Sequence, residues 1–360
     1  MVIMKTFKNL FQKVYSINNL YDAYEKACKN KSNSSQVIEF TKNLKRNISF
    51  LCKDIREKTY EPKPLQTFIL RDPKTRKISV SAFVDRVMHH AIVNVLQEIF
   101  EPRFILDSYG SRKGKGVLPA INRFYEFMRK VTMNGKLIDN AKNKNQVIGY
   151  VLKCDIYHYF ETVDHEILIN IISKYVDDKD LMWLIKKVLK NYHSEKRGTG
   201  MPLGNWTSQF FANVYLNELD YFAKYHLKAK YYIRYVDDFV ILGNSKKYLL
   251  NCQKEISEFL ETKLKLRLHT DKSKIVPLSK GISFLGFRLF YKYKLIKEKN
   301  VNKIWRKLNH MVFEYKSKSL DLENIINCLY GWIAYSKQAN TYKLRKRLNE
   351  KIKKEMVLIV

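Results

Sequence analysis

The segment KYYIRYVDDFVILG, residues 230–243, decides the fold. It holds two short runs of aromatic and β-branched residues, Tyr231 to Val236 and Phe239 to Leu242, with Asp237 and Asp238 between them. Apolar runs of this length predict buried strands, and an acidic pair between them predicts the tip of a hairpin. Two carboxylates on one tight turn concentrate negative charge, which a divalent metal ion offsets well. The alternative is an ordinary polar turn, because Asp is a common turn residue.

The same four letters, YVDD, also occupy residues 175–178. There they end a helical pattern of apolar residues that begins at Ile167, and Lys179 and Asp180 follow in place of an apolar run. Acids at a helix end without flanking strands predict a solvated helix-to-loop junction. Only the copy at residues 235–238 therefore has the setting of a hairpin site.

The charge balance predicts a polyanionic partner. A chain of 360 residues exceeds the size at which single cores usually stop growing, so subdomains are expected. Its 67 Lys and Arg residues against 35 Asp and Glu give a net charge of +32. A Lys-rich genome makes many proteins mildly basic, but an excess this large, with 24 Tyr and 20 Phe, indicates a polyanion bound in a broad channel. Such binding weakens with salt, because each neutralised phosphate releases counterions.

The expected location is the cytoplasm, without a membrane partner. No apolar run has the length of a membrane span, and the N-terminus lacks the apolar core of a secretory signal. The cysteines are scattered, without CxxC or zinc-ligand spacing, as in a reducing compartment. They are Cys28, Cys52, Cys154, Cys252 and Cys328.

The N-terminal half of the chain changes character near Tyr60. Residues 1 to about 60 predict helices, interrupted by the polar segment 29–35. Thr67 to Leu70 and Ile78 to Phe83 predict two strands joined by the basic segment 71–77, which contains a proline. A solvated turn is the usual meaning of such a segment, but a basic hairpin tip can also clamp a triphosphate.

A glycine-rich basic segment follows the helix predicted for Val84 to Phe100. Between Ser108 and Gly116, three glycines alternate with Arg112, Lys113 and Lys115. Glycines let the main chain approach phosphates closely, so the segment predicts contact with a nucleic-acid backbone. The order of a P-loop is absent.

The C-terminal half alternates strands and helices. A strand is predicted for Val147 to Asp155, and Asp164 is the expected N-cap of the next helix. The other predicted elements are an exposed loop at 131–146, a helix from Ser208 with Phe211, Val214, Tyr215 and Leu219 on one side, a helix at Tyr248 to Leu264, strand-like pieces within Leu266 to Val276, and a strand at Ile282 to Tyr291. From Phe287 onward, eighteen Lys and Arg against six Asp and Glu predict a basic helical subdomain.

These elements give a β-α-β-β-α-β order with Asp155, Asp237 and Asp238 at strand ends. A sheet of that order can gather the three carboxylates at one edge. Two Mg²⁺ ions roughly 3.5–4 Å apart could then activate a hydroxyl and stabilise a leaving pyrophosphate. Asp164 is a further candidate acid, although its position favours the helix cap.

At this point the chain resembles a reverse transcriptase over nearly its whole length. KCDIYHYF at 153–160 resembles the first catalytic-aspartate motif, and YVDD at 235–238 resembles the second. DKSK at 271–274 resembles the motif whose lysine protonates pyrophosphate, and SFLGF at 283–287 resembles the primer-grip hairpin. The resemblance implies an α+β right-hand polymerase with a ferredoxin-like palm. Its expected parts are an N-terminal helical region (1–60), fingers (61–146), palm (147–286) and thumb (287–360).

The resemblance also implies a role for each residue that matches a family motif. Asp155, Asp237 and Asp238 would be the catalytic acids and, with the carbonyl of Ile156, would bind two Mg²⁺ ions, with Mn²⁺ as a substitute. Lys272 would be the general acid, with Lys274 as the alternative. The residues implied to bind the dNTP are Arg71, Arg76, Lys77, Phe160, Leu203 and Gly204, with Phe160 as the steric gate against a 2′-hydroxyl unless it is an ordinary core aromatic. Those implied to bind template or primer are Arg112, Lys113, Lys115, Gln209, Tyr235, Phe284, Leu285 and Gly286.

One departure narrows the family. The helix-opening motif of most reverse transcriptases is Gln-Gly-x-x-x-Ser-Pro, whereas residues 203–209 are LGNWTSQ. Leu203 and Gln209 at these places resemble the enzymes of diversity-generating retroelements, as does the segment GWIAYSKQANTYKLR at 331–345. An apolar side chain cannot constrain the incoming nucleotide by hydrogen bonds as an amide can, so discrimination loosens. This resemblance implies adenine-directed mutagenic retrohoming and a bacterial or phage gene. The implied partners are the RNA template, a DNA or RNA primer, dNTPs and a small helical oligomeric accessory protein.

Other readings remain open. A retron or other phage-defence reverse transcriptase is the first alternative, although the Asn-Ala-x-x-His and Val-Thr-Gly signatures of retron enzymes are not found. A group II intron maturase is less expected, because the sequence continues only about 74 residues beyond Gly286. A non-catalytic RNA-binding scaffold would not need Asp155, Asp237 and Asp238 in a basic cleft.

Overall fold

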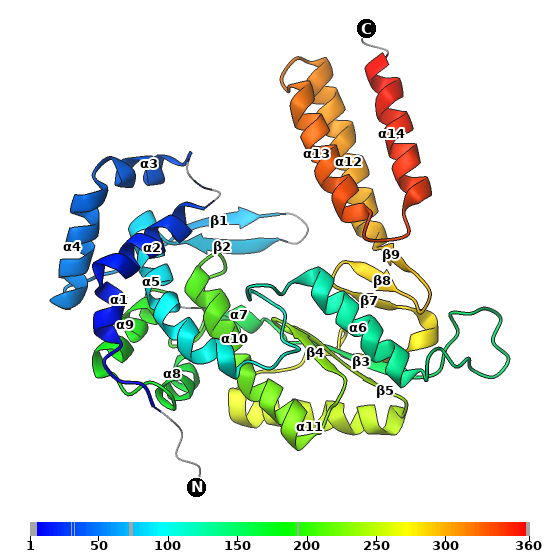
Figure 1. Cartoon of the computed structure of the whole chain (residues 1–360), viewed down its shortest axis with the longest axis horizontal. Helices are drawn as coiled ribbons and strands as arrows, with labels where there is room; N and C mark the ends of the chain where they lie inside the picture. Colours follow the sequence, from blue (N-terminus) through cyan, green and yellow to red (C-terminus); the bar gives the residue numbers. More distant parts are fainter. Residues whose placement is uncertain (1–5, 30, 32, 72–74, 193, 358–360) are drawn as a thin grey trace. The chain divides into compact units, whose positions relative to one another are not determined.

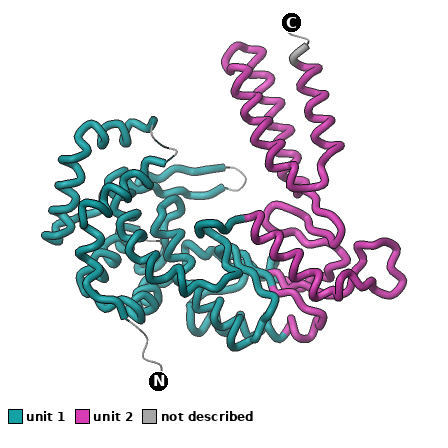
Figure 2. The backbone as a smooth tube through the Cα atoms, in the orientation of Figure 1, with its two compact units in different colours: residues 1–116, 154–240, 251–273 teal, residues 117–153, 241–250, 274–360 magenta. Residues whose placement is uncertain are grey.

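The computed structural model describes residues 6–29, 31, 33–71, 75–192 and 194–357. Figure 1 shows the order of helices and strands. The chain divides into two compact units, coloured separately in Figure 2. Unit 1 consists of residues 1–116, 154–240 and 251–273, and unit 2 of residues 117–153, 241–250 and 274–360. The division into fingers, palm and thumb at the boundaries expected from the sequence stays a prediction.

Unit 1 begins with the predicted helices. They are α1 (Phe11–Tyr15), α2 (Ile17–Cys28), α3 (Ser35–Lys42) and α4 (Leu44–Arg56). The polar segment ends α2 at Cys28, and Ser34 starts α3 by accepting a hydrogen bond from Val37 N. On α4, Ile48, Leu51 and Ile55 are buried, which confirms the apolar face expected from their spacing.

The predicted hairpin and the helix after it follow. β1 (Gln66–Leu70) pairs antiparallel with β2 (Arg76–Val80), and residues 72–74 at the tip lie outside the described part of the chain. The second strand ends at Val80 and not at Phe83 as expected. Phe83 is instead the first residue of α5 (Phe83–Phe100) and is buried, because the main chain turns where Ser81 N donates to Asn205 Oδ1 at 3.2 Å.

The central sheet has the predicted β-α-β-β-α-β order. Its strands are β3 (Tyr150–Asp155), β4 (Tyr232–Tyr235), β5 (Asp238–Gly243) and β6 (Lys274–Pro277), which lie side by side as β4-β5-β3-β6. β3 starts at Tyr150 and not at Val147, because Gly149 before it has a φ of +96°. Only residues 274–277 of the strand-like segment after Leu266 form a strand.

Helices connect these strands. Between β3 and β4 lie α7 (Tyr159–Thr162), α8 (His165–Ser173), α9 (Lys179–Lys190) and α10 (Trp206–Tyr221), which a π-helical turn, Phe222–His226, extends. α11 (Lys246–Leu264) joins β5 to β6. Asp164 N-caps α8 as predicted, accepting from Glu166 N and Ile167 N.

α10 differs from its prediction in two ways. It begins at Trp206, two residues before Ser208, because Asn205 has an extended backbone and precedes the first helical residue. Its burial is not restricted to one side. Residues 210–217 are all buried, so the helix passes through the interior of unit 1.

Unit 2 contains α6 (Val117–Val131), a small sheet and the C-terminal helices. The sheet has the order β7 (Ile282–Phe284), β8 (Phe287–Leu289) and β9 (Lys294–Ile296). The single strand predicted for Ile282 to Tyr291 is a hairpin, since Leu285 and Gly286 turn the chain with φ values of +43° and +90°.

The predicted C-terminal helices are present, but they begin at Glu298 and not at Phe287, because β8 and β9 come first; their standing as a separate subdomain stays a prediction. They are α12 (Glu298–Lys316), α13 (Leu322–Ser336) and α14 (Tyr342–Val357). Their shared core is built from Ile304, Leu308, Met311, Ile325, Leu348 and Ile352. The five cysteines are free thiols, and no helix of the described residues is long and apolar enough to cross a membrane.

Candidate active site

The second YVDD copy forms the predicted hairpin tip in unit 1. β4 ends at Tyr235, and β5 starts at Asp238, so Val236 and Asp237 make the turn. Val236 has a φ of +55°. This region is unfavourable for a β-branched residue, and such strain costs about 1–3 kcal/mol. Strain of this kind is retained where the surroundings require one backbone orientation.

Asp155 and Asp237 are brought together at this turn. Ile156 N, next to Asp155, donates to the carbonyl oxygen of Asp237 at 3.3 Å. Burial raises the pKa of Asp237 to about 6; the carboxylates of Asp155 and Asp238 add to the rise, and Arg76 offsets part of it. The surrounding protein therefore does not fully stabilise the ionised carboxylate of Asp237, and a bound cation would.

Lys272 contacts the first of these acids. Its Nζ donates to Oδ1 of Asp155 at 2.7 Å, and the loop that carries it is anchored by His269 N, which donates to the carbonyl of Asp155 at 2.8 Å. Lys274, the alternative general acid, is the first residue of β6 and pairs with Lys153. Of the two candidates, Lys272 is the one whose ammonium lies on a site acid.

The side chains that converge at this site match only part of the predicted set of Mg²⁺ ligands. Among the described residues, no three His, Cys, Asp or Glu side chains converge to hold a metal ion. Mg²⁺ commonly takes one or two protein carboxylates and completes its shell with substrate phosphates and water. Asp155 and Asp237 supply donors of that kind, so the residues fit an ion that is bound together with its substrate.

The residues predicted to bind the dNTP lie on segments that touch one another. Ser79 N, in β2, donates to the carbonyl of Leu203 at 3.1 Å. A Cβ on Gly204 would lie 3.3 Å from Ile78 and 3.4 Å from the carbonyl of Ser79, and its φ of +120° also favours glycine. Segment 203–204 therefore runs beside the strand that begins with Arg76 and Lys77, while Arg71, at the end of β1, is exposed.

Phe160 lies at the edge of the core, with its ring centroid 5.3 Å from that of the buried Tyr159. It is half-buried in α7, whereas its neighbour Tyr159 is fully enclosed and donates its hydroxyl to the carbonyl of Ala212 at 2.8 Å. The main chain of Phe160 is fixed, since Met201 N donates to its carbonyl at 2.6 Å. Both the steric gate and the packed aromatic stay predictions for Phe160, which is partly accessible.

The residues predicted to bind template or primer in unit 1 differ in accessibility. Gln209 is exposed at the start of α10 and accepts a hydrogen bond from Ser111 Oγ at 3.1 Å, which joins this helix to the glycine-rich segment. Lys113 is exposed, Lys115 donates to the carbonyl of Leu106, and Tyr235 is half-buried.

Arg112 is occupied within the protein. Its side chain is 7% exposed and binds Glu101 at 2.8 Å and the carbonyls of Ile105 and Ser108. These contacts give it a structural role in shaping the segment, and they leave little of the guanidinium for a phosphate.

The predicted primer-grip residues lie in unit 2. Phe284 is buried, and Leu285 and Gly286 form the β7–β8 turn. The carbonyl of Gly286 accepts from Lys297 N at 3.1 Å and from the side chain of Tyr335 at 3.4 Å. The turn is therefore joined to the C-terminal helices of the same unit.

The family follows from a match over most of this structure. Residues 62–289 match the family described as reverse transcriptase (RNA-dependent DNA polymerase). The chain belongs to the reverse transcriptase family. Its fold is thus that of a right-hand polymerase with mixed helices and strands, and its enzymatic class is RNA-directed DNA polymerase.

Several curated proteins resemble this reverse transcriptase. Protein YkfC of Escherichia coli is 28% identical over 272 residues, covering 65% of this chain and 68% of that protein. The group II intron-encoded protein LtrA of Lactococcus lactis is 23% identical and covers 79% of this chain, which in turn spans 57% of LtrA. A putative COX1/OXI3 intron 2 protein of Saccharomyces cerevisiae is 24% identical, with this chain spanning 38% of its length.

Among solved structures, a telomerase of Candida tropicalis is similar with 12% identity and a TM-score of 0.46. It covers 68% of this chain, and this chain covers 57% of it. A score this low adds nothing to the assignment, which rests on the family match.

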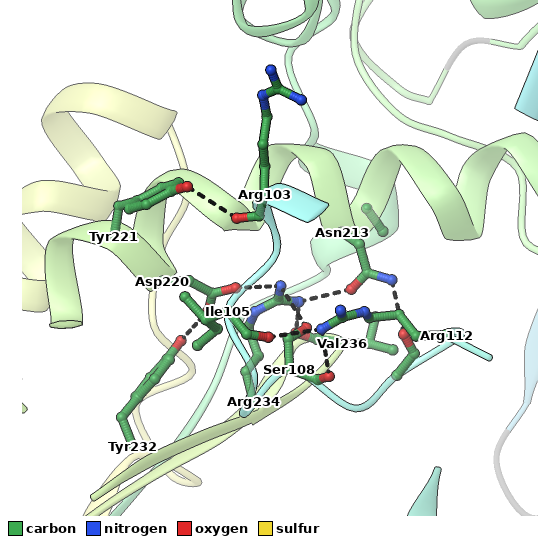
Figure 3. A network of polar contacts seen from close by, with 12 residues as sticks. Arg103, Ile105, Ser108, Arg112, Asn213, Asp220, Tyr221, Tyr232, Arg234 and Val236 are labelled. Atoms are coloured by element: carbon green, nitrogen blue, oxygen red, sulfur yellow. Dashed lines mark hydrogen bonds and ion pairs between the residues drawn. The ribbon is translucent and has the colours of Figure 1, made fainter. Parts of the chain in front are cut away.

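A buried ion pair that was not predicted from the sequence lies beside the reverse transcriptase hairpin (Figure 3). Arg234 in β4 and Asp220 in α10 are both 0% exposed, and their side chains form a two-point contact at 2.7 and 2.6 Å. The signal that could have indicated it is the charged Arg234 inside an otherwise apolar predicted strand, because a charge there requires a buried partner.

The first YVDD copy has a structural role in this enzyme. Asp178 N-caps α9 by accepting from Asp180 N and Leu181 N, and it also accepts from Leu10 N at 2.7 Å and Phe11 N at 2.9 Å. Burial raises the pKa of Asp178, but these main-chain hydrogen bonds outweigh it and hold the pKa below its usual value. The junction is therefore only partly solvated, which corrects the prediction for this acid.

Proposed function

We propose that this reverse transcriptase copies a structured RNA template into cDNA by two-metal nucleotidyl transfer at Asp155, Asp237 and Asp238. The observation that carries the proposal is the adjacency of Asp155 and Asp237 across the Ile156 N to Asp237 carbonyl hydrogen bond. When bound there, Mg²⁺, or Mn²⁺ in its place, would activate the primer hydroxyl and stabilise the charge that develops on the phosphates. Asp155 and Asp237, with the carbonyl of Ile156, provide the protein ligands, and Asp238 completes the acidic pair.

Lys272 is the proposed general acid. Its Nζ holds a proton at Oδ1 of Asp155, within the site, and passes it to the departing pyrophosphate oxygen. Arg76 and Lys77, with Arg71 directly after β1, bind the triphosphate, because Arg binds phosphate oxygens in a two-point geometry. The electrostatic effect of Arg76 on Asp237 supports this placement.

Phe160 and the segment 203–204 are proposed to contact the sugar and base of the incoming nucleotide. Phe160 is half-buried and five residues beyond Asp155, so it keeps accessible surface for a ribose. Lys113, Lys115, Gln209 and Tyr235, together with Phe284, Leu285 and Gly286 of unit 2, are the proposed contacts to template and primer. Arg112 supports this surface through its contacts with Glu101.

The proposed biological role is the error-prone copying step of a diversity-generating retroelement. Leu203 stands where most family members have glutamine, and it lies beside β2 of the proposed dNTP site. A leucine side chain provides no hydrogen bond to a nucleotide, so template adenines would be copied with reduced fidelity, by resemblance to that group. A small helical oligomeric protein is the proposed accessory partner, to be sought by co-purification from the native operon.

A group II intron-type enzyme is the second candidate. It is favoured by the similarity to LtrA and to the yeast intron 2 protein, each of which covers at least three quarters of this chain. A retron-like or other defence enzyme shares the same domain. The neighbouring genes distinguish these roles, since a template repeat with a variable repeat accompanies only the retroelement.

The test is Mg²⁺-dependent cDNA synthesis on one RNA template, with deep sequencing of the product. We expect Leu203→Gln to lower misincorporation opposite adenine several-fold and to change guanine and cytosine positions less. Leu203→Met is the matched control, because it keeps an apolar side chain of similar volume, and its error spectrum should equal that of the parent. Uniformly low error in the parent would exclude the diversity-generating role while leaving the polymerase intact.

A further inference from the structure

The guanidinium of Arg234 is completely enclosed and satisfied. It makes five hydrogen bonds, matching the five N–H groups of an arginine. Nε and Nη2 bind the carboxylate of Asp220, Nη2 also donates to Ser108 Oγ at 3.1 Å, and Nη1 donates to Asn213 Oδ1 at 3.0 Å and to the carbonyl of Val236 at 3.2 Å (Figure 3). With every donor used, the side chain has one orientation.

One of these bonds acts directly on the strained turn. Val236, with its φ of +55°, lies two residues after Arg234 and immediately before Asp237. The carbonyl of Val236 and the N–H of Asp237 belong to one planar peptide unit. Arg234 therefore fixes the orientation of the main chain from which the Asp237 carboxylate projects.

The turn is also enclosed by the segment that precedes the glycine-rich loop. Arg234 N donates to the carbonyl of Asp107 at 3.0 Å, and Tyr109 N donates to the carbonyl of Arg234 at 2.9 Å, so residues 107–109 run beside β4. At Gly110, a Cβ would lie 2.8 Å from Val236 N, which leaves no room for another side chain. Asn213 Nδ2 holds the carbonyl of Gly110 at 2.8 Å.

We propose that the Arg234–Asp220 ion pair is a positioning device that holds the Val236–Asp237 peptide in its strained orientation and thereby keeps Asp237 beside Asp155. The inference deepens the proposed function and rests on the metal-binding role of Asp237 given there. A buried ion pair contributes little net stability compared with apolar residues of similar volume, so geometry is the property that it adds. Lysine cannot replace it, because a single ammonium lacks the planar fork that binds two partners at once.

The first test is Arg234→Lys, measured by single-nucleotide incorporation and by Mg²⁺-induced thermal stabilisation of the enzyme bound to a dideoxy-terminated primer–template and dNTP. We expect kcat to fall about 10- to 100-fold, KM for the dNTP to stay within about threefold, and stabilisation to require more Mg²⁺. The matched control is Glu218→Gln on the same helix, which removes a surface ion pair with Lys174 at 2.8 Å and should change none of these values. An unchanged kcat and Mg²⁺ requirement in folded Arg234→Lys would overturn the proposal.

A second pair of variants separates positioning from simple stabilisation. Arg234→Met combined with Asp220→Leu replaces the ion pair by apolar side chains, so the fold should persist while kcat stays low. Wild-type kcat in this folded double variant would show that the pair only stabilises. Adding Val236→Gly to Arg234→Lys should recover several-fold of kcat, because glycine adopts a positive φ without strain and needs no clamp. A purely structural role predicts no such recovery.

If Arg234→Lys does not fold, Asn213→Ala provides the same test, since it removes one partner of Arg234 and the support of Gly110. We expect a smaller loss of kcat, about threefold to tenfold, with an unchanged KM. A folded Asn213→Ala enzyme with full kcat would contradict the proposal. Two outcomes distinguish the proposals. An active Asp237→Ala enzyme would contradict the proposed function itself. An inactive Asp237→Ala enzyme together with a fully active Arg234→Lys enzyme would contradict only the positioning role.

Discussion

Residues 175–178 and 235–238 have the same sequence, Tyr-Val-Asp-Asp, in two different backbones. In the first copy, Val176 is buried beside Phe7 in a short parallel bridge, and Asp178 caps α9. In the second copy, Val236 takes a positive φ at a hairpin tip, and Asp237 lies next to Asp155. The identity of the four residues therefore decides neither conformation nor role.

The two copies differ in the groups that surround the carboxylates of Asp178 and Asp237. The carboxylate of Asp178 is surrounded by main-chain N–H donors, and its pKa is lowered. The carboxylate of Asp237 is half-buried near two other carboxylates, and its pKa is raised to about 6. A charge satisfied by the protein supports structure, whereas a charge left in need of a proton or a cation is typical of a functional site.

The largest expected effect is on catalysis. Asp237→Ala should reduce cDNA synthesis by about 10³-fold or more, because it removes a metal ligand and not a template contact. RNA binding, measured at a fixed salt concentration by filter retention, should stay nearly unchanged. Asp177→Ala is the matched control: the carboxylate of this exposed acid forms a surface ion pair with Lys8 at 3.2 Å, so activity should be normal. If Asp177→Ala were inactive and Asp237→Ala active, the first copy and not the second would be the catalytic one.

The two copies should also respond oppositely to charge removal in metal-free buffer. Ionisation of Asp237 at neutral pH is unfavourable in the folded state, so Asp237→Asn should increase the free energy of unfolding by about 2–3 kcal/mol above pH 6. This gain should vanish below about pH 4, where the native acid is protonated in both states. Denaturant unfolding at several pH values measures it.

Asp178→Ala should instead destabilise the protein by about 1–2 kcal/mol through loss of the cap. Because the pKa of Asp178 is lowered, the stability it supplies is present above its unfolded pKa and is lost as pH falls through the folded value. Destabilisation by both variants at neutral pH would mean that Asp237, too, is satisfied within the protein.

A smaller effect concerns the sugar of the nucleotide at the second copy. Phe160→Val should raise incorporation of ribonucleotides relative to deoxyribonucleotides by about tenfold, since a smaller side chain leaves room for a 2′-hydroxyl. Tyr192→Phe serves as a control, being a conservative change at a half-buried aromatic beyond α9. An active Phe160→Val enzyme with unchanged discrimination would exclude the steric gate.

Much of the fold could be predicted from local patterns. The apolar runs around Asp237, the helix of α5 and the cap at Asp164 depend on residues within a few positions of one another. The same patterns misplaced the ends of β2, β3 and α10, where the deciding contacts come from Asn205, Gly149 and the main chain around them. Patterns along the chain identify elements better than they locate their ends.

The candidate site was predictable as a set of residues but not as an arrangement. Arg112 was expected to face nucleic acid, yet its guanidinium is enclosed by Glu101 and two carbonyls. No role was predicted for Arg234, although it contacts Ser108, 126 residues earlier in the chain. Neither outcome can be seen from neighbouring residues, because both depend on which distant segments close around the side chain.

The sequence by itself determined the strand–turn–strand pattern at residues 230–243, the order of the acids along the chain and the basic character of the protein. These follow from side-chain chemistry and short-range periodicity. Only the tertiary structure decided that Asp237 lies beside Asp155, that Lys272 and not Lys274 contacts an acid, and that Arg234 holds a strained turn. The reason is physical: burial, electrostatic neighbours and backbone strain arise between segments that are far apart in sequence and meet only when the chain has folded.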